Sequence, residues 1–215
     1  MRNSEGSPNP ESPHPAVSPM PRQKVSAKAA ALARLHARIR TCDRCPLWRT
    51  RTQAVPGAGS AHARVVFVGE APGRQEDLTG QPFVGAAGRF LDELLASVGL
   101  SRQRVYITNV VKSRPVTGPP PRRNRAPRPE EIEACVPWLA EQLAIIKPAL
   151  VVTLGRIALE HFLPGEKISR VHGRPVTRGS MTILPLYHPA MALYRRDWTE
   201  MLRQDFRIIP RLLKK

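Results

Sequence analysis

The chain has 215 residues, and its 34 basic against 17 acidic side chains give a formal net charge of +17. A charge excess of this size predicts a polyanionic partner, and nucleic acid is the first candidate. Because 41% of the residues are apolar and only 24% are charged, the chain can bury a core, which excludes a wholly disordered basic tail.

The sequence also argues against a membrane or an extracellular setting. No apolar run approaches the length that crosses a bilayer, and the N-terminus lacks the layout of a signal peptide. Three cysteines, an odd number, do not suggest a disulfide framework, so metal binding and redox chemistry are open to them. We therefore expect a cytoplasmic protein without membrane contact.

The first segment differs in composition from the rest. Residues 1–24 are rich in proline and nearly free of apolar side chains, which predicts a disordered tail with a net charge of only +1. Residues 25–215 are expected to form one domain. It begins with an alanine-rich helix over residues 25–40, which ends just before the Cys-x-x-Cys pair of Cys42 and Cys45.

Four short runs rich in valine and isoleucine predict strands that are buried on both faces. Apolar residues also recur at helical spacing in 90–98 and in 132–146, the second run following Pro129, which suits a first helical turn. The alternation predicts an α/β fold, a three-layer α/β/α sandwich around a central four-stranded parallel sheet. The four predicted strands are 65–68, 105–108, 150–154 and 182–186.

Polar residues follow each predicted strand, and ligands of parallel sheets gather at the carboxyl ends of the strands. Taken alone, each of these residues has an ordinary structural explanation as a turn, a cap or a packed side chain. The usual phosphate-cofactor motifs are missing, because Gly57 and Gly59 precede a strand and no Gly-Lys-Ser/Thr loop occurs. The strand-end segments are 69–73, Asn109, Gly155 with Arg156, and 188–190.

Several motifs in order resemble the family 4 uracil-DNA glycosylases, the iron-sulfur type, over about residues 41–213. The resemblance implies an enzyme of base-excision repair that flips uracil out of DNA and hydrolyses its N-glycosidic bond, with uracil-containing DNA as partner. It implies a monomer that associates with the nucleoid through DNA. The motifs are 69–73, Glu76 with Asp77, 80–85, 87–88, 108–112, 114–115, 129–131 and 188–190.

The resemblance assigns catalytic roles to Glu70, Asn109 and His188. Asn109 would accept a hydrogen bond from uracil N3–H and donate one to O4, whereas cytosine presents the opposite pattern. His188 would stabilise the charge that develops on uracil O2, and Glu70 would position or activate the water. Glu76 or Asp77 would support the site. The expected substrate-binding residues are Gly69, Ala71, Gly73, Phe83, Asn109 and His188, with Phe83 stacking on the base.

Contacts to DNA are expected on either side of this pocket. Leu193 is the candidate wedge that fills the gap left by the flipped base, and Arg195 and Arg196 would hold phosphates. An extended loop over residues 114–125, longer than in the family by about half a dozen residues, adds further arginines. From Lys112 to Arg128 the chain has six basic residues and no acidic one. The loop's expected DNA-binding residues are Arg114, Arg122 and Arg123.

Members of this family hold a [4Fe-4S] cluster with four cysteines. Cys42, Cys45 and Cys135 match three of these positions, and Ser113 stands at the fourth. Serine is a harder and less acidic ligand than a thiolate, so an altered, labile or absent cluster are all outcomes of this change. We expect a retained cluster in which Ser113 or another non-cysteine group is the fourth ligand. Alternatively Cys135 is a packed helix residue, or the cysteines bind zinc.

Two other functions are weighed against the enzyme. A related group in the superfamily captures uracil-DNA covalently through a histidine in an extended basic loop, but this loop has no histidine and Ala71 replaces that group's glutamine. A non-catalytic DNA-binding descendant is the other alternative, and the joint presence of Glu70, Asn109 and His188 argues against it.

Overall fold

The computed structural model describes residues 26–179, 181–193 and 195–214. In this part of the chain, a sheet of six strands lies between two layers of helices, and a two-stranded hairpin stands apart from it. The sheet order is β1-β3-β2-β6-β8-β7. Its strands are β1 (Ala58–Gly59), β2 (Val65–Gly69), β3 (Tyr106–Asn109), β6 (Leu150–Leu154), β7 (Val176–Arg178) and β8 (Met181–Leu186), and the hairpin pairs β4 (Val116–Thr117) with β5 (Arg123–Asn124).

The four central strands run parallel, as the valine-rich runs predict. Residues of β2, β3 and β6 are buried throughout, because helices cover both faces of the sheet. In the register, Gly69 pairs with Asn109 across β2 and β3, and Thr153 pairs with Pro185 across β6 and β8. The carboxyl ends of the four strands therefore lie along one edge.

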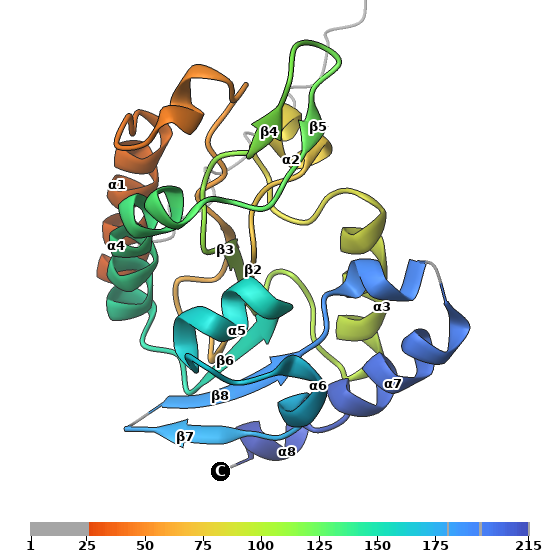
Figure 1. Ribbon diagram of the computed structural model, residues 1–215. Helices are drawn as coiled ribbons and strands as arrows, with labels where there is room; N and C mark the ends of the chain where they lie inside the picture. Colours follow the sequence, from red (N-terminus) through yellow and green to blue (C-terminus); the bar gives the residue numbers. More distant parts are fainter. Residues whose placement is uncertain (1–25, 180, 194, 215) are drawn as a thin grey trace, which may run out of the picture.

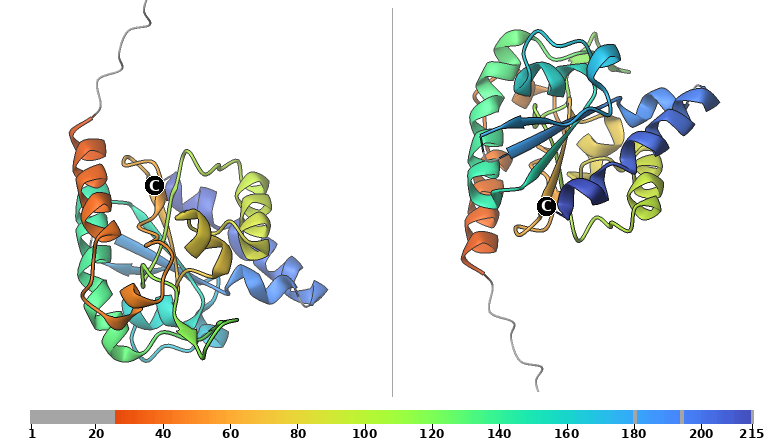
Figure 2. Two further views of the ribbon diagram at one scale, coloured as in Figure 1. Left: turned by 90° about the horizontal axis from the view of Figure 1, so that it is seen from above. Right: turned by 90° about the horizontal axis from the view of Figure 1, so that it is seen from below.

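Two helical layers cover this sheet (Figures 1 and 2). On one face, α1 (Ala27–Arg40) and α4 (Pro129–Ile146) pack against each other and against the side chains of Val66 and Val68. On the other face, α3 (Ala86–Ser97), α7 (Arg196–Phe206) and α8 (Ile209–Leu213) pack on Val65 and Phe67. The three-layer α/β/α arrangement predicted from the sequence is confirmed.

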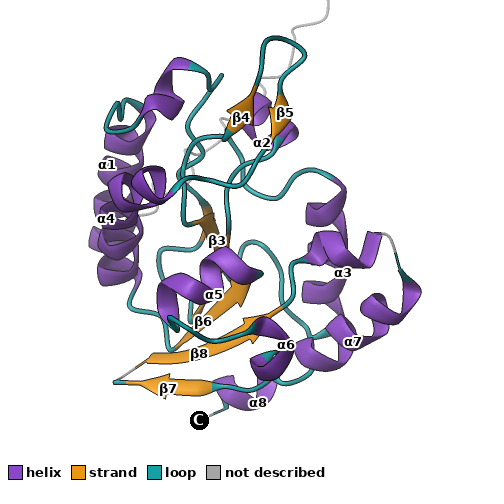
Figure 3. Cartoon of the chain, in the orientation of Figure 1, coloured by secondary structure: helices purple, strands orange, loops and turns teal. Residues whose placement is uncertain are grey.

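The remaining elements are short and connect the layers (Figure 3). Helices α5 (Arg156–Phe162) and α6 (Ile168–Val171) follow β6, and α2 (Arg74–Thr79) follows β2. Two 3-10 helices, η1 (Pro46–Arg49) and η2 (Pro189–Leu193), come after the cysteine pair and after β8. No helix in the described ranges is long and apolar enough to cross a membrane.

The sequence locates the central elements to within a few residues. The predicted helix at 25–40 is α1, those at 90–98 and 132–146 are α3 and α4, and each parallel strand differs from its prediction by at most one residue at either end. The structure adds the antiparallel edge strands β1 and β7, so four parallel strands are the centre of a six-stranded mixed sheet. The predicted tail at 1–24 lies outside the described residues.

Candidate active site

A cavity of about 440 Å³ opens at the carboxyl ends of β2, β3 and β8. Its wall combines the turn after β2, the loop before α3, the end of β3, the residue before η2 and the last residue of η2. The hairpin and the segment after it complete the rim. The lining residues include Glu70, Ala71, Gly73, Glu76, Phe83, Asn109, Asn124, Arg125, His188 and Leu193. Sequence positions far apart in the chain therefore meet here, as the strand-end pattern predicts.

Gly69 sits where Asn109 and Phe83 approach each other. A Cβ atom at Gly69 would lie 2.4 Å from Asn109 Oδ1 and 2.6 Å from Phe83 Cζ. Only a residue without a side chain leaves room for both groups. Asn109 is 2% exposed and Phe83 is 5% exposed, so the amide and the ring are held in the wall with only their edges accessible.

A buried polar network holds the backbone of Asn109 from behind. The Lys112 ammonium donates to the Asn109 carbonyl at 2.6 Å, to Thr108 Oγ1 at 2.8 Å and to Gln142 Oε1 at 2.8 Å. Burial lowers the pKa of Lys112 to about 7. All three donor positions of this buried ammonium have acceptors, which satisfies the group inside the core.

The network continues from Gln142 toward α1. The Gln142 amide donates to the Pro56 carbonyl at 2.7 Å and to the Tyr106 hydroxyl at 2.8 Å. The Tyr106 hydroxyl in turn lies 2.7 Å from His36 Nε2. Burial, with Arg40 and Lys112 nearby, lowers the pKa of His36 to about 4, so this imidazole is neutral at pH 7.

His188 stacks on Phe83, with ring centroids 5.5 Å apart and an interplanar angle of 26°. Its Nδ1 accepts a hydrogen bond of 3.1 Å from the Ala190 backbone N–H. Burial lowers the pKa of His188 to about 4, although Glu76 opposes the shift. In a neutral imidazole whose Nδ1 accepts, Nε2 carries the proton. The fold therefore fixes the tautomer, which the sequence alone could not give.

Glu70 lies in the turn after β2, half-buried in the cavity wall. Burial raises the pKa of its carboxyl, and the positive charge of Arg156 at the start of α5 opposes the rise. In its ionised form, a carboxylate placed this way can hold or deprotonate a water molecule.

Glu76 ties together the two loops that form one side of the cavity. Its Oε1 accepts from the backbone N–H groups of Val84 and Gly85, both at 2.9 Å, and its Oε2 accepts from that of Gly73 at 3.1 Å. Asp77, the alternative supporting residue, accepts instead from the Thr52 N–H at 2.9 Å and does not line the cavity. Of the two residues expected to support the site, only Glu76 is therefore in the cavity wall, and its supporting role stays a prediction.

The rim carries the residues expected to meet DNA. Leu193 borders the cavity and is 46% exposed, and Met191 on the same 3-10 helix is 42% exposed. Arg195 is exposed and forms an ion pair with Asp197 at 2.6 Å. The side chain of Arg196 lies outside the described part of the structure.

The extended loop folds as the β4–β5 hairpin (Figures 1 and 3), and Asn124 of β5 lies near Gly73, the residue before α2. Arg114 holds it, donating to Asn124 Oδ1 at 2.6 Å and to the Arg122 carbonyl at 3.2 Å. Arg122 also donates to the Thr50 carbonyl at 3.3 Å, and Arg123 is exposed. The two hairpin arginines thus face solvent near the cavity, whereas Arg114 is engaged in shaping the hairpin.

Cys135 is buried in the apolar core that α1 and α4 form with one face of the sheet, and Cys42 and Cys45 are partly buried against the same core. Cys42 Sγ accepts from the Trp138 indole N–H and Cys135 Sγ from the Lys112 N–H, both at 3.2 Å. Burial raises the pKa values of the Cys45 and Cys135 thiols. Within the described residues, no three His, Cys, Asp or Glu side chains are spaced to hold a single metal ion.

Ser113, at the fourth cluster position, is 3% exposed, and its hydroxyl accepts a hydrogen bond of 3.0 Å from Arg51 Nη1. Arg51 also donates to the Arg40 carbonyl at 3.0 Å. The serine oxygen therefore faces a guanidinium rather than standing free as a donor atom for a metal.

Sequence reasoning missed the residues that act from behind the cavity. Lys112 and Gln142 lie 30 positions apart in the chain, and neither carries a local pattern that points to the other. Arg102, whose contacts with the Phe83 loop are described below, reads as an ordinary basic residue in a turn. The signal that could have found Lys112 is its place directly after a buried strand and two valines, where a charged residue needs partners.

Comparison with known proteins extends these observations. The family model of the uracil-DNA glycosylase superfamily matches residues 56–208. A type-4 uracil-DNA glycosylase of Archaeoglobus fulgidus is 47% identical over 186 residues, which cover 82% of this chain and 90% of the relative. A type-4 enzyme of Sulfurisphaera tokodaii is 41% identical, covering 85% and 84% of the two chains. A type-5 uracil-DNA glycosylase of Thermus thermophilus is 35% identical over 69% and 70%.

Proposed function

Because the chain belongs to the uracil-DNA glycosylase superfamily, we propose that it removes uracil from DNA by hydrolysing the N-glycosidic bond. The product is an abasic site for base-excision repair. One observation carries the assignment: Asn109, Phe83 and His188, distant in sequence, line a single cavity with Glu70. The cavity supplies an amide that can pair with the edge of the base and an aromatic ring that can stack on it. It also supplies a hydrogen-bond donor for the developing negative charge and a carboxylate that can hold the attacking water.

Recognition rests on Asn109. Its side-chain carbonyl accepts from uracil N3–H and its amide nitrogen donates to uracil O4, and cytosine reverses both positions. A site built to pair with specific polar groups rejects a base that leaves them unpaired, because buried polar groups without partners are costly. Lys112 and the strand pairing to Gly69 hold the Asn109 backbone in place.

Bond cleavage gives a cationic sugar and a uracil anion. The Nε2–H of neutral His188 donates to uracil O2, where negative charge accumulates as the bond breaks. Because Nδ1 already accepts from Ala190, the proton stays on the nitrogen that faces the base. Glu70 holds the attacking water and stabilises the sugar cation, while Phe83 stacks on the extruded base.

Uracil reaches the cavity only outside the helical stack. Leu193 at the rim fills the vacated position in the duplex, with Met191 beside it. Arg122 and Arg123 of the hairpin contact phosphates on the other side of the cavity, and Arg195 contacts a phosphate when it leaves Asp197. We propose that the enzyme acts as a monomer. It would be located with the DNA of the cell.

We also infer that Cys42, Cys45 and Cys135 hold an iron-sulfur cluster of the [4Fe-4S] type. The shared packing of the three residues and the N–H donors at two of the sulfurs support this. When bound, the cluster would join the segment after α1 to α4 and stabilise the fold. Ser113, whose hydroxyl accepts from Arg51, would be the fourth ligand, and because oxygen is a harder ligand than thiolate sulfur the cluster would be more labile than one held by four cysteines.

Iron and sulfide analysis of anaerobically purified protein tests the cluster. We expect both elements at a substoichiometric level that rises in a Ser113→Cys variant, with broad visible absorption that bleaches in air. Absence of iron at any stoichiometry in both proteins would overturn the cluster assignment.

The glycosylase proposal is tested with a single-uracil oligonucleotide, followed by alkali and a denaturing gel. Strand cleavage after alkali is expected. An intact strand would refute the glycosylase, and a heat-stable shifted band would indicate covalent capture instead. Asn109→Asp should weaken uracil recognition, because a carboxylate cannot donate to O4, and unchanged activity would refute the role of Asn109.

A further inference from the structure

Phe83 adopts a backbone conformation that residues with a side chain disfavour. Its φ is 54°, in the left-handed region, and among the described residues only Lys147 shares this property without being glycine. A non-glycine residue in this region costs on the order of 1 kcal/mol, so the surrounding structure must hold it there. The ring is therefore placed by contacts, not by local preference.

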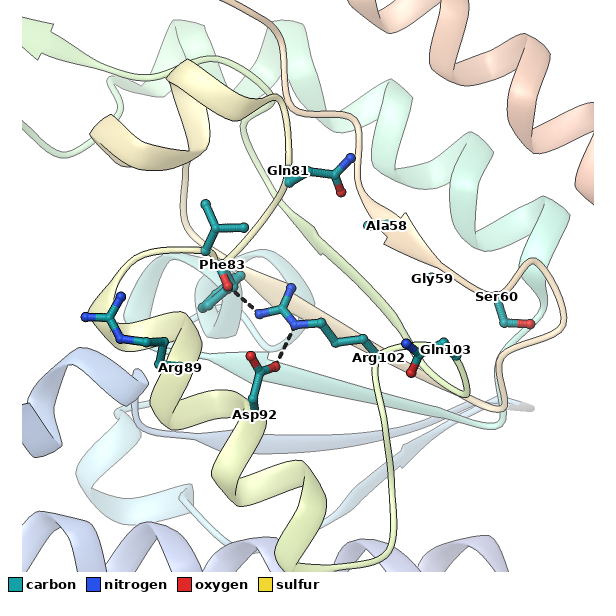
Figure 4. A pocket seen from close by; sticks show the side chains of 10 residues that line it. Ala58, Gly59, Ser60, Gln81, Phe83, Arg89, Asp92, Arg102 and Gln103 are labelled. Carbon is teal, nitrogen blue, oxygen red and sulfur yellow. Dashed lines mark hydrogen bonds and ion pairs between the residues drawn. The ribbon is translucent and has the colours of Figure 1, made fainter.

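A second cavity, of about 690 Å³, is lined by Phe83 together with Asp92 and Arg102 (Figure 4). Phe83 is the residue that it shares with the candidate active site. Arg102, in the turn between α3 and β3, extends along this cavity toward the Phe83 loop, and Asp92 of α3 lies beneath it (Figure 4).

The Arg102 guanidinium is the main polar contact of that loop. Nη1 donates to the Pro82 carbonyl at 2.9 Å, Nη2 donates to the Phe83 carbonyl, and Nε donates to Asp92 Oδ1 at 2.6 Å. All three guanidinium nitrogens thus have acceptors within the protein, two of them in the Phe83 loop.

Packing closes the loop from the other direction. A Cβ at Gly88, in the first turn of α3, would lie 1.8 Å from the Phe83 carbonyl oxygen that Arg102 binds. Glu76 holds the next two backbone N–H groups, those of Val84 and Gly85. The backbone of Phe83 is consequently fixed on both sides, and the guanidinium supplies the only cationic contact among these described groups.

We propose that Arg102 is a positioning residue for uracil excision: it holds Phe83 in its strained conformation and thereby sets the ring against the flipped base. The inference rests on the proposed function, in which Phe83 stacks on uracil. A planar fork is required, because two carbonyls and one carboxylate are bound at once, and lysine offers a point charge with different geometry. Arg102 itself does not touch the base.

The test compares Arg102→Gln and Arg102→Lys with wild type, in both the native and the Phe83→Ala background. The matched control is Arg104→Gln, which removes the same charge from an exposed residue of the same turn. Single-turnover rates, affinity for uracil-free DNA and melting temperature are measured for each variant. Asp92→Asn, which removes the negative charge of the group that Nε binds but keeps an acceptor oxygen, is the milder variant if Arg102→Gln does not fold.

Arg102→Gln and Arg102→Lys should each lower the single-turnover rate about tenfold, the size expected for loss of a charge-assisted hydrogen bond. Asp92→Asn should lower it by a smaller factor. In the Phe83→Ala background all three substitutions should have little further effect, because a residue that acts through Phe83 has nothing left to position. Affinity for uracil-free DNA and the activity of Arg104→Gln should stay at wild-type levels.

The inference would be overturned if an Arg102 substitution lowered the rate by the same factor in the Phe83→Ala background as in the native one. Arg102 would then act independently of the ring. Full activity of Arg102→Lys would overturn it as well, since charge alone would suffice. Wild-type protein without glycosylase activity, or an innocuous Phe83→Ala, would instead refute the proposed function or the stacking role on which the inference depends.

Discussion

The space above Gly69 gives the most direct test of the cavity's geometry. In Gly69→Ala the added methyl carbon would start 2.4 Å from Asn109 Oδ1 and 2.6 Å from Phe83 Cζ. Real contacts of this kind are longer than 3 Å, so both groups must retreat. The φ of Gly69 is outside the left-handed range, and the alanine backbone is therefore unstrained. The substitution is therefore expected to displace the side chains of the site while the backbone at position 69 keeps its conformation.

Neither neighbour can move freely. The Asn109 backbone is held by Lys112 and the Phe83 backbone by Arg102, so relief requires off-rotamer side chains or a shift of β2. Overpacking of this kind costs about 1 to 3 kcal/mol in stability. A displacement of about 1 Å at a reacting group costs on the order of 100-fold in rate. We expect kcat/KM to fall about 100-fold while the fold persists.

The assay is single-turnover cleavage of a uracil oligonucleotide, with thermal melting measured in parallel. Gly165→Ala is the matched control: it adds the same methyl group in open space, at a φ of +81° where alanine is strained by roughly 1 to 2 kcal/mol. The control should lose stability to a similar degree and keep its activity. Wild-type kcat/KM in Gly69→Ala would refute the placement of Asn109 and Phe83 as the groups that hold the base.

Three further predictions concern charge. Arg156→Gln should move the acid limb of the kcat/KM pH profile to higher pH, because burial raises the pKa of Glu70 and Arg156 opposes that rise; an unshifted limb would argue against Glu70 as its origin. Lys112→Met should reduce the free energy of unfolding, measured with urea, by about 3 kcal/mol, because the buried oxygens that accept from Lys112 would lose their donor. An unchanged free energy of unfolding would mean that these oxygens find other donors. Replacing Arg122 and Arg123 with glutamine should reduce the slope of log affinity against log salt by about 2, if each contacts one phosphate, and an unchanged slope would contradict those contacts.

The strand-end residues were predictable because of one property of parallel sheets. Valine-rich runs identify the four central strands, and parallel strands present their carboxyl ends at a common edge. Glu70, Asn109 and His188 were therefore expected along one edge of the sheet once the fold class was set. The edge strands β1 and β7 were not predicted because they have two and three residues, too few to show the side-chain alternation of a strand.

The supporting groups could not be predicted in the same way. Lys112 meets Gln142 only because α4 packs across β3, and Arg102 meets the Phe83 loop only because the turn after α3 returns beneath it. These contacts depend on how elements stack in three dimensions, not on spacing within any one element. The tautomer of His188 likewise depends on an N–H donor that η2 happens to present.

The basic residues of this protein fall into two groups with different surroundings. The exposed arginines of the hairpin and rim are the groups proposed to attract DNA of any sequence. Lys112, which is buried, and Arg102, which is partly buried, are occupied with protein carbonyls and hold Asn109 and Phe83 from opposite sides. The groups proposed to meet the base, the Asn109 amide, the Phe83 ring and His188 with its pKa near 4, are uncharged at pH 7. Selectivity for uracil then depends on fixed dipoles whose positions are set in advance, and Lys112 and Arg102 support these dipoles without lining the cavity that holds them.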